Sequence, residues 1–313
     1  MKLYKNDKKS APKSSLGDLG VYHFLYGITF LHALLPFCVL YILSDILSFL
    51  MYHIIRYRRR LVRKNLILSF PEKSKKEIIR IEKDFYRNFC DCIVETIKVL
   101  HISKEEIRKR MNFTNIEILR PYFEKGDSFV MTLGHYGNWE WVSSLALWLP
   151  KDMLIGQIYR ELKNKPFDKL MYNLRARFDA DNIEKKEVLR TIIKSIRAGK
   201  KFIIGFIADQ KPSPNNMHYW TTFLNQETSV LTGPERIANQ SNAVVFYMDV
   251  KKIKRGYYEA EIIIISDNPK AEKENEITEK YIRLMENTIM RNPALWLWSH
   301  NRWKHKRSTI ENQ

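Results

Sequence analysis

Cysteine is scarce in this 313-residue chain. The three cysteines, Cys38, Cys90 and Cys92, cannot make a paired disulfide framework. Cys90 and Cys92 lie two positions apart, but no further ligand residues accompany them, so the spacing of a zinc site is missing as well. We therefore expect reduced, structural thiols, and no metal site.

Acidic residues are also few. The chain has 35 Asp and Glu against 53 Lys and Arg, which gives a formal net charge of +18. Such an excess says nothing about fold, but it favours anionic partners, namely nucleic acid, an acidic lipid surface or an acidic carrier protein. The basic residues are spread over the whole chain and no nucleic-acid-binding motif accompanies them, so the sequence argues against nucleic acid.

Charge is absent altogether from Leu19 to Ser44. This segment is long enough to cross a bilayer, is too long for the core of a signal peptide and lacks a small-residue cleavage site. Both flanks are basic, which places both ends in the cytoplasm, and Pro36 can divide the segment into two shorter helices. A membrane-embedded hairpin or interfacial anchor is the favoured interpretation; the alternatives are a single span and a buried soluble helix. The flanking basic residues are Lys2, Lys5, Lys8, Lys9 and Lys13 before it, and Arg56, Arg58, Arg59, Arg60, Arg63 and Lys64 after it.

The rest of the chain lacks repeats, low-complexity tracts and any linker that would separate a second globular domain. We expect residues 1–70 to form a basic N-terminus with a membrane-anchoring segment and residues 71–313 to form one domain. Short apolar runs alternate with amphipathic segments, which predicts an α/β fold with a mixed, largely parallel central sheet flanked by helices. Expected strands are 128–134, 153–159, 201–210, 243–250 and 257–266; expected helices are 72–100, 139–149, 166–178, 188–199, 233–240 and 275–291.

The stretch "FVMTLGHYGNWEW" (129–141) is the strongest candidate for a site. Ligands of open α/β sheets bind beyond the carboxyl ends of the strands, where His135 is expected. Residues five apart on one helix point about 140° away from each other, so His135 and Glu140 converge only if His135 lies in a loop before the helix. Glu140 would then hold one ring nitrogen and leave the other to take a proton from a substrate hydroxyl. The alternative is an ordinary loop histidine.

No serine or cysteine occupies a nucleophile elbow, so direct transfer is favoured over a covalent enzyme intermediate. "GHYGNWEW" (134–141) resembles the H-x4-D/E motif of the bacterial lipid A late (secondary) acyltransferases, of the lauroyl and myristoyl type, within the glycerolipid acyltransferase superfamily. The resemblance covers about residues 20 to 305. Four further blocks are similar to the same family in the same order: "RRRLVRKNLILSFPEKS" (58–74), "IYRELKNKPFDKLMYNLRARF" (158–178), "ADQ" (208–210) and "ALWLWSHNRWK" (294–304).

The resemblance implies a membrane-bound enzyme of lipopolysaccharide biosynthesis at the cytoplasmic face of the inner membrane. It would transfer a fatty acyl chain from acyl carrier protein to a hydroxyl of a lipid A precursor, without a cofactor. The basic chain would meet both the anionic membrane surface and the acidic carrier protein. An O-acyltransferase that makes an amino-acid lipid or a phospholipid from its lyso form is the alternative.

The resemblance also implies roles for single residues. His135 is the expected general base and Glu140 its orienting partner. The backbone N–H groups of Gly137 and Asn138, or the side chain of Arg160, are candidates for binding the oxyanion. Further assignments are Arg160 and Arg175 for the acceptor phosphates, and Asp209 and Gln210 for binding acceptor hydroxyls or bracing the site, with surface charge and strand capping as the structural alternatives.

Two departures from the family pattern concern positions where glycine is common. One is Asn225 in "TFLNQ", and the other is the "RFDAD" stretch (177–181) after the arginine-bearing helix. Because Asn and Asp tolerate a positive φ, we expect the backbone to keep its shape there. A tryptophan cluster, Trp296, Trp298 and Trp303, is expected to form either an interfacial belt or part of the core.

Overall fold

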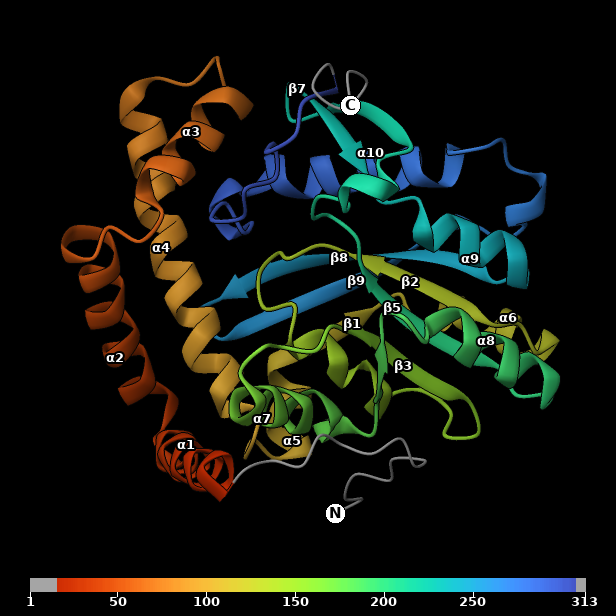
Figure 1. The fold of residues 1–313 in the computed structure, drawn as a ribbon, viewed down its shortest axis with the longest axis horizontal. Helices are drawn as coiled ribbons and strands as arrows, with labels where there is room; N and C mark the ends of the chain where they lie inside the picture. The colour runs from red at the N-terminus through yellow and green to blue at the C-terminus, as the bar shows by residue number, and fades with distance from the viewer. Residues whose placement is uncertain (1–15, 308–313) are drawn as a thin grey trace.

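The computed structural model describes residues 16–307. The five N-terminal lysines that flank the uncharged segment lie outside the described residues. A central sheet is seen nearly edge-on in Figure 1, with helices above and below it and the N-terminal helices along one end of the strands.

The elements follow the alternation expected from the sequence. The α-helices are α1 (Leu16–Leu34), α2 (Phe37–Phe49), α3 (Arg59–Ser69), α4 (Lys75–Lys98), α5 (Lys104–Arg110), α6 (Arg120–Lys125), α7 (Lys165–Arg175), α8 (Val188–Arg197), α9 (Gly233–Ser241) and α10 (Glu276–Arg291). The strands are β1 (Met111–Thr114), β2 (Phe129–Leu133), β3 (Leu154–Tyr159), β4 (Asp181–Glu184), β5 (Phe202–Ile207), β6 (Tyr219–Phe223), β7 (Gln226–Val230), β8 (Val244–Lys254) and β9 (Tyr257–Ser266).

Seven strands form the main sheet in the order β1-β9-β8-β2-β5-β3-β4. Every pairing is parallel except that of β8 with β9, so the sheet is mixed and largely parallel, as expected. Strand β2 lies at its centre, between β8 and β5, and every residue of β2 is buried. Such continuous burial is typical of a parallel strand with a layer of helices on each face. Helices α9 and α10 cover one face and α5 and α7 lie toward the other (Figure 1).

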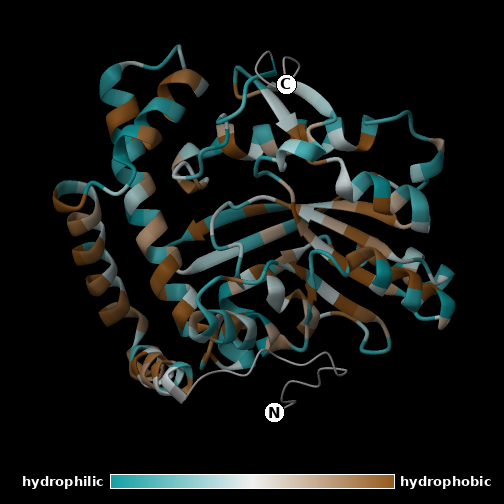
Figure 2. Ribbon diagram, viewed as in Figure 1, coloured by the Kyte–Doolittle hydropathy of each residue, from teal (hydrophilic) through white to brown (hydrophobic). Residues whose placement is uncertain are grey.

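The uncharged segment forms two helices that meet at Pro36, as its sequence suggested. Helix α2 continues into a π-helical segment, η1 (Leu50–Ile54), and Phe37–Ile54 is long and apolar enough to cross a membrane. Only 22% of that stretch is buried, whereas the core helix of a soluble protein is mostly buried. Helix α2 packs against α4, and α1 packs against α4 and α7. Figure 2 shows how strongly apolar α1 and α2 are at this edge of the molecule.

Local backbone features also agree with the sequence. Helix α4 begins with a complete capping box made by Ser74 and Glu77. Asn225 and Asp179 have φ values of 60° and 66°, which confirms the expectation that Asn and Asp adopt a positive φ in these two stretches. Leu224, beside Asn225, also has a positive φ of 49°, which no feature of the sequence predicts.

Candidate active site

Two parallel neighbouring strands bring His135 and Asp209 together. Strand β2 pairs with β5 from Phe129 opposite Ile203 to Leu133 opposite Ile207. Both strands end at this last pair. The residues two positions further on, His135 after β2 and Asp209 after β5, therefore lie side by side at the carboxyl edge of the sheet. The sequence placed both residues at this edge, and the structure confirms that placement.

Asp209, and not Glu140, holds the imidazole of His135. The distance from Nδ1 of His135 to Oδ1 of Asp209 is 2.7 Å, and the backbone N–H of His135 donates to Oδ2 at 3.0 Å. The indole N–H of Trp296 donates to the same Oδ2 at 2.7 Å. An ionised carboxylate only accepts, so Nδ1 is the nitrogen that donates, and in the neutral imidazole Nε2 then keeps its lone pair.

The free ring nitrogen faces Gln210. The side-chain amide of Gln210 donates to Nε2 of His135 over 3.2 Å, and 19% of the His135 side chain is exposed. A substrate hydroxyl that takes the place of the Gln210 amide would meet Nε2 of His135 as its proton acceptor, while Asp209 holds Nδ1 on the other side of the ring. This arrangement suits general-base catalysis. It differs from the expected one in that Asp209 takes the orienting role that was expected of Glu140; of the two roles expected for Asp209, bracing the site is the one that its contacts match.

The surroundings keep Asp209 ionised. Burial acts to raise the pKa of the Asp209 carboxyl, but electrostatic attraction and hydrogen bonds from His135, together with the Trp296 indole, hold that pKa below its usual range. Arg302 is buried close by, and burial lowers the pKa of its guanidinium to about 10. Burial also lowers the pKa of His300 to about 4, so this second histidine is neutral at neutral pH.

The loop that carries His135 is fixed from both sides. A Cβ at Gly134 would lie too close to Cε of Met285, so the end of that side chain would have to move, and Gly137 adopts a φ of +59°. The carbonyl of His135 accepts the backbone N–H of Leu297 at 3.1 Å, while the N–H of Gly137 donates to the carbonyl of Leu295 at 3.0 Å. The assignment of Gly137 to the oxyanion is therefore wrong, because its N–H group is already used within the fold.

Glu140 has a different partner from the expected one. Its carboxylate forms a bidentate pair with Arg175, with distances of 2.9 Å to Nε and 2.6 Å to Nη2, and 8% of its side chain is exposed. The expectation that Glu140 orients His135 is therefore wrong. The same pair occupies Arg175, whose expected role at acceptor phosphates is corrected as well. The Glu140 carboxylate instead joins the loop after β2 to the end of α7.

Of the remaining candidate residues, Arg160 is exposed and Asn138 is buried. Arg160 follows β3 at the carboxyl edge and is exposed. Strand β3 lies two positions from β2, so Arg160 follows a strand about 10 Å from the one that leads to His135. Asn138 is fully buried, and its side-chain Oδ1 accepts the backbone N–H of Trp141 at 3.1 Å. This bond satisfies the N–H of the first residue of a short 3-10 helix, η3 (Trp141–Leu147), where the sequence predicts an α-helix.

The tryptophan cluster belongs to the core. Trp296 and Trp298 are 2% and 0% exposed, so the interfacial-belt alternative is wrong for both. The partly buried Trp303 donates from its indole to Thr228. The tie between Trp296 and Asp209 was not predicted, although both residues lie in blocks that the sequence singled out.

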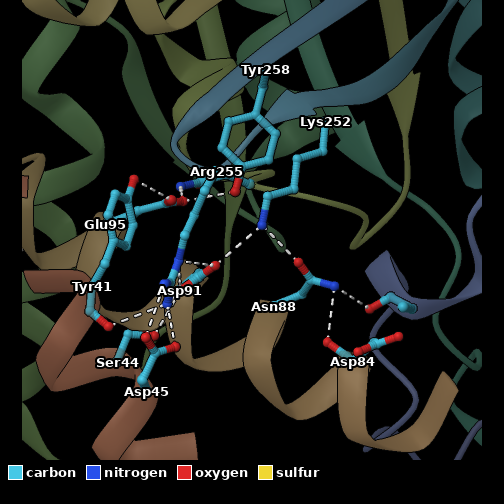
Figure 3. A network of polar contacts seen from close by, with 12 residues as sticks. Tyr41, Ser44, Asp45, Asp84, Asn88, Asp91, Glu95, Lys252, Arg255 and Tyr258 are labelled. Carbon is cyan, nitrogen blue, oxygen red and sulfur yellow. Dashed lines mark hydrogen bonds and ion pairs between the residues drawn. The ribbon is translucent and has the colours of Figure 1, made fainter. Parts of the chain in front are cut away.

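Glu95 is a buried acid behind the His135 loop that sequence reasoning missed. It is buried on α4, and its Oε2 accepts from the Asn138 side-chain amide at 2.8 Å and from Tyr258 at 2.9 Å. Its Oε1 accepts from Tyr41 of α2 at 3.0 Å, so one carboxyl group joins the His135 loop to the N-terminal helices (Figure 3). Burial raises the pKa of Glu95 to about 7. Its position on an amphipathic helix gave no signal beyond that of an ordinary surface acid.

Within residues 16–307, no group of three or more His, Cys, Asp or Glu side chains is arranged to hold a metal ion. The site therefore offers proton transfer at an imidazole, a buried carboxylate that fixes the imidazole, and an exposed arginine at the same sheet edge.

Comparisons with known proteins point in one direction. The family model described as bacterial lipid A biosynthesis acyltransferase matches residues 8–305. The lipid A biosynthesis palmitoleoyltransferase of Escherichia coli K12 is 23% identical over 283 residues, covering 89% of each chain. The lauroyltransferase of the same organism is 22% identical with the same coverage. A lipid A biosynthesis acyltransferase of Haemophilus influenzae is 24% identical over 250 residues, covering 79% of this chain and 78% of that one.

Proposed function

Because the chain belongs to the bacterial lipid A biosynthesis acyltransferase family, and is thus an acyltransferase of lipid A biosynthesis, we propose the following specific reaction. The enzyme is bound to the cytoplasmic face of the inner membrane. There it transfers a fatty acyl chain from acyl carrier protein to a hydroxyl of a lipid A precursor. The observation that carries this proposal is the Asp209–His135–Gln210 arrangement, in which a fixed imidazole presents Nε2 to an approaching hydroxyl.

The transfer proceeds without a covalent enzyme intermediate. His135 Nε2 takes the proton of the acceptor hydroxyl while the hydroxyl oxygen attacks the thioester carbonyl. The tetrahedral oxyanion collapses and breaks the carbon–sulfur bond, so the thiolate of the carrier leaves. The imidazolium returns its proton to this thiolate, and the ester product and free thiol are released. The Asp209 carboxylate stabilises the imidazolium between the two proton transfers.

Charge supports the choice of both substrates. The chain carries a net charge of +18, which attracts an acidic carrier protein and an anionic membrane surface. Arg160 is exposed at the sheet edge that carries His135, and a guanidinium binds phosphate oxygens through two parallel hydrogen bonds. We assign the acceptor phosphate to Arg160 for this reason. Arg175 has no such role because Glu140 occupies it.

The reaction is tested with purified enzyme, acyl carrier protein thioesters and lipid A precursors, with mass spectrometry as the readout. The expected result is an ester-linked acyl chain on the precursor, lost in His135→Ala and kept in the matched control His218→Ala, an exposed histidine. A deletion strain separates the acceptors. Lipid A that lacks one acyl chain supports the proposal, whereas unchanged lipid A with altered amino-acid lipids or phospholipids would establish the alternative acceptor.

A further inference from the structure

Helix α2 has its apolar side facing outward, whereas a helix on the surface of a soluble protein has its apolar side facing the core. Ser44 and Ser48 point toward the protein and are buried there together with Leu40, whereas most of the apolar side chains point away. Asp45 lies at the border between the two sides, with 56% of its side chain exposed. The outward stripe follows helical spacing and is 36–61% exposed: Ile42, Leu43, Ile46, Phe49 and Leu50. An exposed apolar stripe of this kind marks a contact with something other than water.

The inward stripe of α2 is held by a polar network of the catalytic domain (Figure 3). Ser44 donates to Asp91 of α4 at 2.8 Å. Arg255, at the turn between β8 and β9, pairs with both Asp45 of α2 and Asp91, each at 2.7 Å. With the bond from Tyr41 to Glu95, these contacts fix the rotation of α2 about its axis, so the apolar stripe faces outward.

Helix α1 repeats the pattern. Its exposed apolar side chains recur three or four positions apart, at Val21, Phe24, Ile28 and Leu31, with exposed fractions of 48% to 68%. Its inward side carries the buried Thr29 and Ala33. His32, at the edge of the exposed stripe, contacts α4, because its Nε2 lies 3.1 Å from the carbonyl oxygen of Val94. The two helices therefore present their apolar stripes on the outside of the same end of the molecule (Figure 2).

An arginine cluster follows directly after the apolar stripe. A hollow of about 590 Å³ is lined by Arg56, Arg58, Arg59, Arg60, Leu61 and Arg63. The buried Glu82 pairs with Arg59 and Arg63. Arg56 and Arg60 are exposed. Five guanidinium groups against one carboxylate leave an excess of four positive charges, which suits the phosphates of lipid headgroups.

The ion pairs of Arg255 with Asp45 and Asp91 argue against a membrane-spanning orientation of α2. The 18 residues of Phe37–Ile54 extend about 27 Å, close to the thickness of the hydrocarbon core of a bilayer. Asp45 lies halfway along them. If α2 crossed the bilayer, the Asp45–Arg255 pair, Asp91 and the turn between β8 and β9 would lie near the bilayer midplane, where charges and non-helical backbone are strongly disfavoured.

We propose that α1 and α2, with η1, lie in the plane of a single anionic leaflet and do not cross the bilayer. The outward stripes contact acyl chains, and Arg56 and Arg60 bind phospholipid phosphates. In this orientation the catalytic domain lies in water, next to the leaflet that holds α1 and α2. Of the two arrangements expected from the sequence, a membrane-embedded hairpin and an interfacial anchor, the proposal selects the interfacial anchor. The proposal rests on the proposed function only for the choice of a bilayer as partner.

The first test is flotation of the full chain with vesicles of phosphatidylglycerol and phosphatidylethanolamine. Each basic side chain near an anionic surface contributes about fivefold to partitioning, so Arg56→Gln with Arg60→Gln lowers it about 25-fold. The matched charge control, Lys194→Gln with Arg197→Gln on α8, leaves partitioning unchanged; Figure 1 shows α8 far from α2. Vesicles of neutral phosphatidylcholine show a smaller difference.

Apolar variants have a matched control as well. Ile46→Ser with Phe49→Ser lowers vesicle binding tenfold or more per residue, because burial of each side chain in the acyl region is lost. Leu189 and Ile193 of α8 are 46% and 40% exposed, and their replacement by serine leaves binding unchanged. The proposal is overturned if vesicle binding is lost in the α8 variants and kept in the α2 variants. It is also overturned if the chain does not bind vesicles and a second copy of it covers the apolar stripe in solution.

Cysteine labelling separates the in-plane arrangement from a spanning one. Cys38 is exposed at the start of α2, whereas Cys90 and Cys92 are buried. Gly20 of α1 accepts a side chain without contacts, so Gly20→Cys in a Cys38→Ser background reports on the other helix. A membrane-impermeant maleimide is expected to label neither position in intact spheroplasts and both after solubilisation. Labelling of either from outside contradicts the proposal, and neither outcome depends on acyl transfer.

Discussion

The carboxylate of Asp209 contacts His135 twice, through Oδ1 to the ring Nδ1 at 2.7 Å and through Oδ2 to the backbone N–H at 3.0 Å. The first contact fixes the tautomer and the second fixes the loop. Trp296 adds a third bond, to Oδ2, that keeps the carboxylate in place. The general base is thus positioned by the neighbouring strand β5 and not by the acid five residues along its own loop.

Asp209→Asn should remove most of the activity without unfolding the protein. The amide is nearly the same size as the carboxylate but can hold the ring in the wrong tautomer and does not stabilise an imidazolium. We expect kcat to fall about 10²- to 10⁴-fold. Steady-state kinetics with a circular dichroism spectrum for each variant measure this. A fall of less than threefold would remove Asp209 from the mechanism.

Glu140→Ala should destabilise the protein by leaving the guanidinium of Arg175 without its partner. Burial acts to lower the pKa of Arg175, but the hydrogen bonds and charge of Glu140 outweigh burial and raise that pKa. Removal of one member of such a pair costs roughly 3 kcal/mol of unfolding free energy.

A double-mutant cycle with Arg175→Ala shows whether the two residues act as a pair. We expect the double variant to be no less stable than Glu140→Ala alone, and the two single variants to lose activity to a similar extent. Additive losses in urea denaturation would show that Glu140 does not act through Arg175.

Arg160→Gln should weaken acceptor binding. Hydrogen bonds to charged groups contribute roughly 1.5–3 kcal/mol, so KM for a phosphorylated lipid A precursor should rise about tenfold or more while kcat changes little. Arg190→Gln, also an exposed arginine, serves as the control. An equal rise in KM for a dephosphorylated acceptor would show that Arg160 does not recognise phosphate.

Glu95 should make stability depend on pH. Burial raises its pKa from the ordinary 4.5 to about 7, although hydrogen bonds from Asn138 and Tyr258 and the charge of Lys252 act in the opposite direction. Between these two values the folded protein binds a proton that the unfolded chain has lost. The contribution of Glu95 to the free energy of unfolding is therefore largest below pH 4.5. It falls by roughly 3 kcal/mol as the pH rises to about 7 and is constant at higher pH.

Denaturant unfolding of the wild type and Glu95→Gln at pH 5.5 and pH 8 measures this contribution. The glutamine variant is expected to be less stable at pH 5.5, where it lacks one acceptor, and to lose less stability on going to pH 8. A pH dependence identical to that of the wild type would show that Glu95 is ionised throughout.

The layered architecture and the position of the site were predictable from the sequence. Buried runs such as Phe129–Leu133 and helices with clear punctuation, such as the one that begins at Ser74, carry local signals. Polar residues directly after β2 and β5 had to lie at one edge once both strands were parallel members of the same sheet. Strands β1, β4, β6 and β7 are short, of four or five residues, and their sequences have too little periodicity to be recognised.

The partner of His135 was not predictable from local spacing. A carboxylate five positions away looks like the natural partner, but the register of β2 with β5 brings in one 74 positions away. The pairing of Glu140 with Arg175 likewise depends on how α7 packs, which no local pattern encodes. Glu95 was missed because its significance comes from its neighbours on α2 and β9.

The most direct test of the account is the turnover of His135→Ala with acyl carrier protein thioester and a lipid A precursor, quantified by mass spectrometry of the acylated product. Loss of the general base predicts a fall in kcat of about 10²- to 10⁴-fold, with folding and vesicle binding retained. Near-normal turnover in this variant would contradict the assignment of His135 and, with it, the mechanism built on the Asp209–His135 pair.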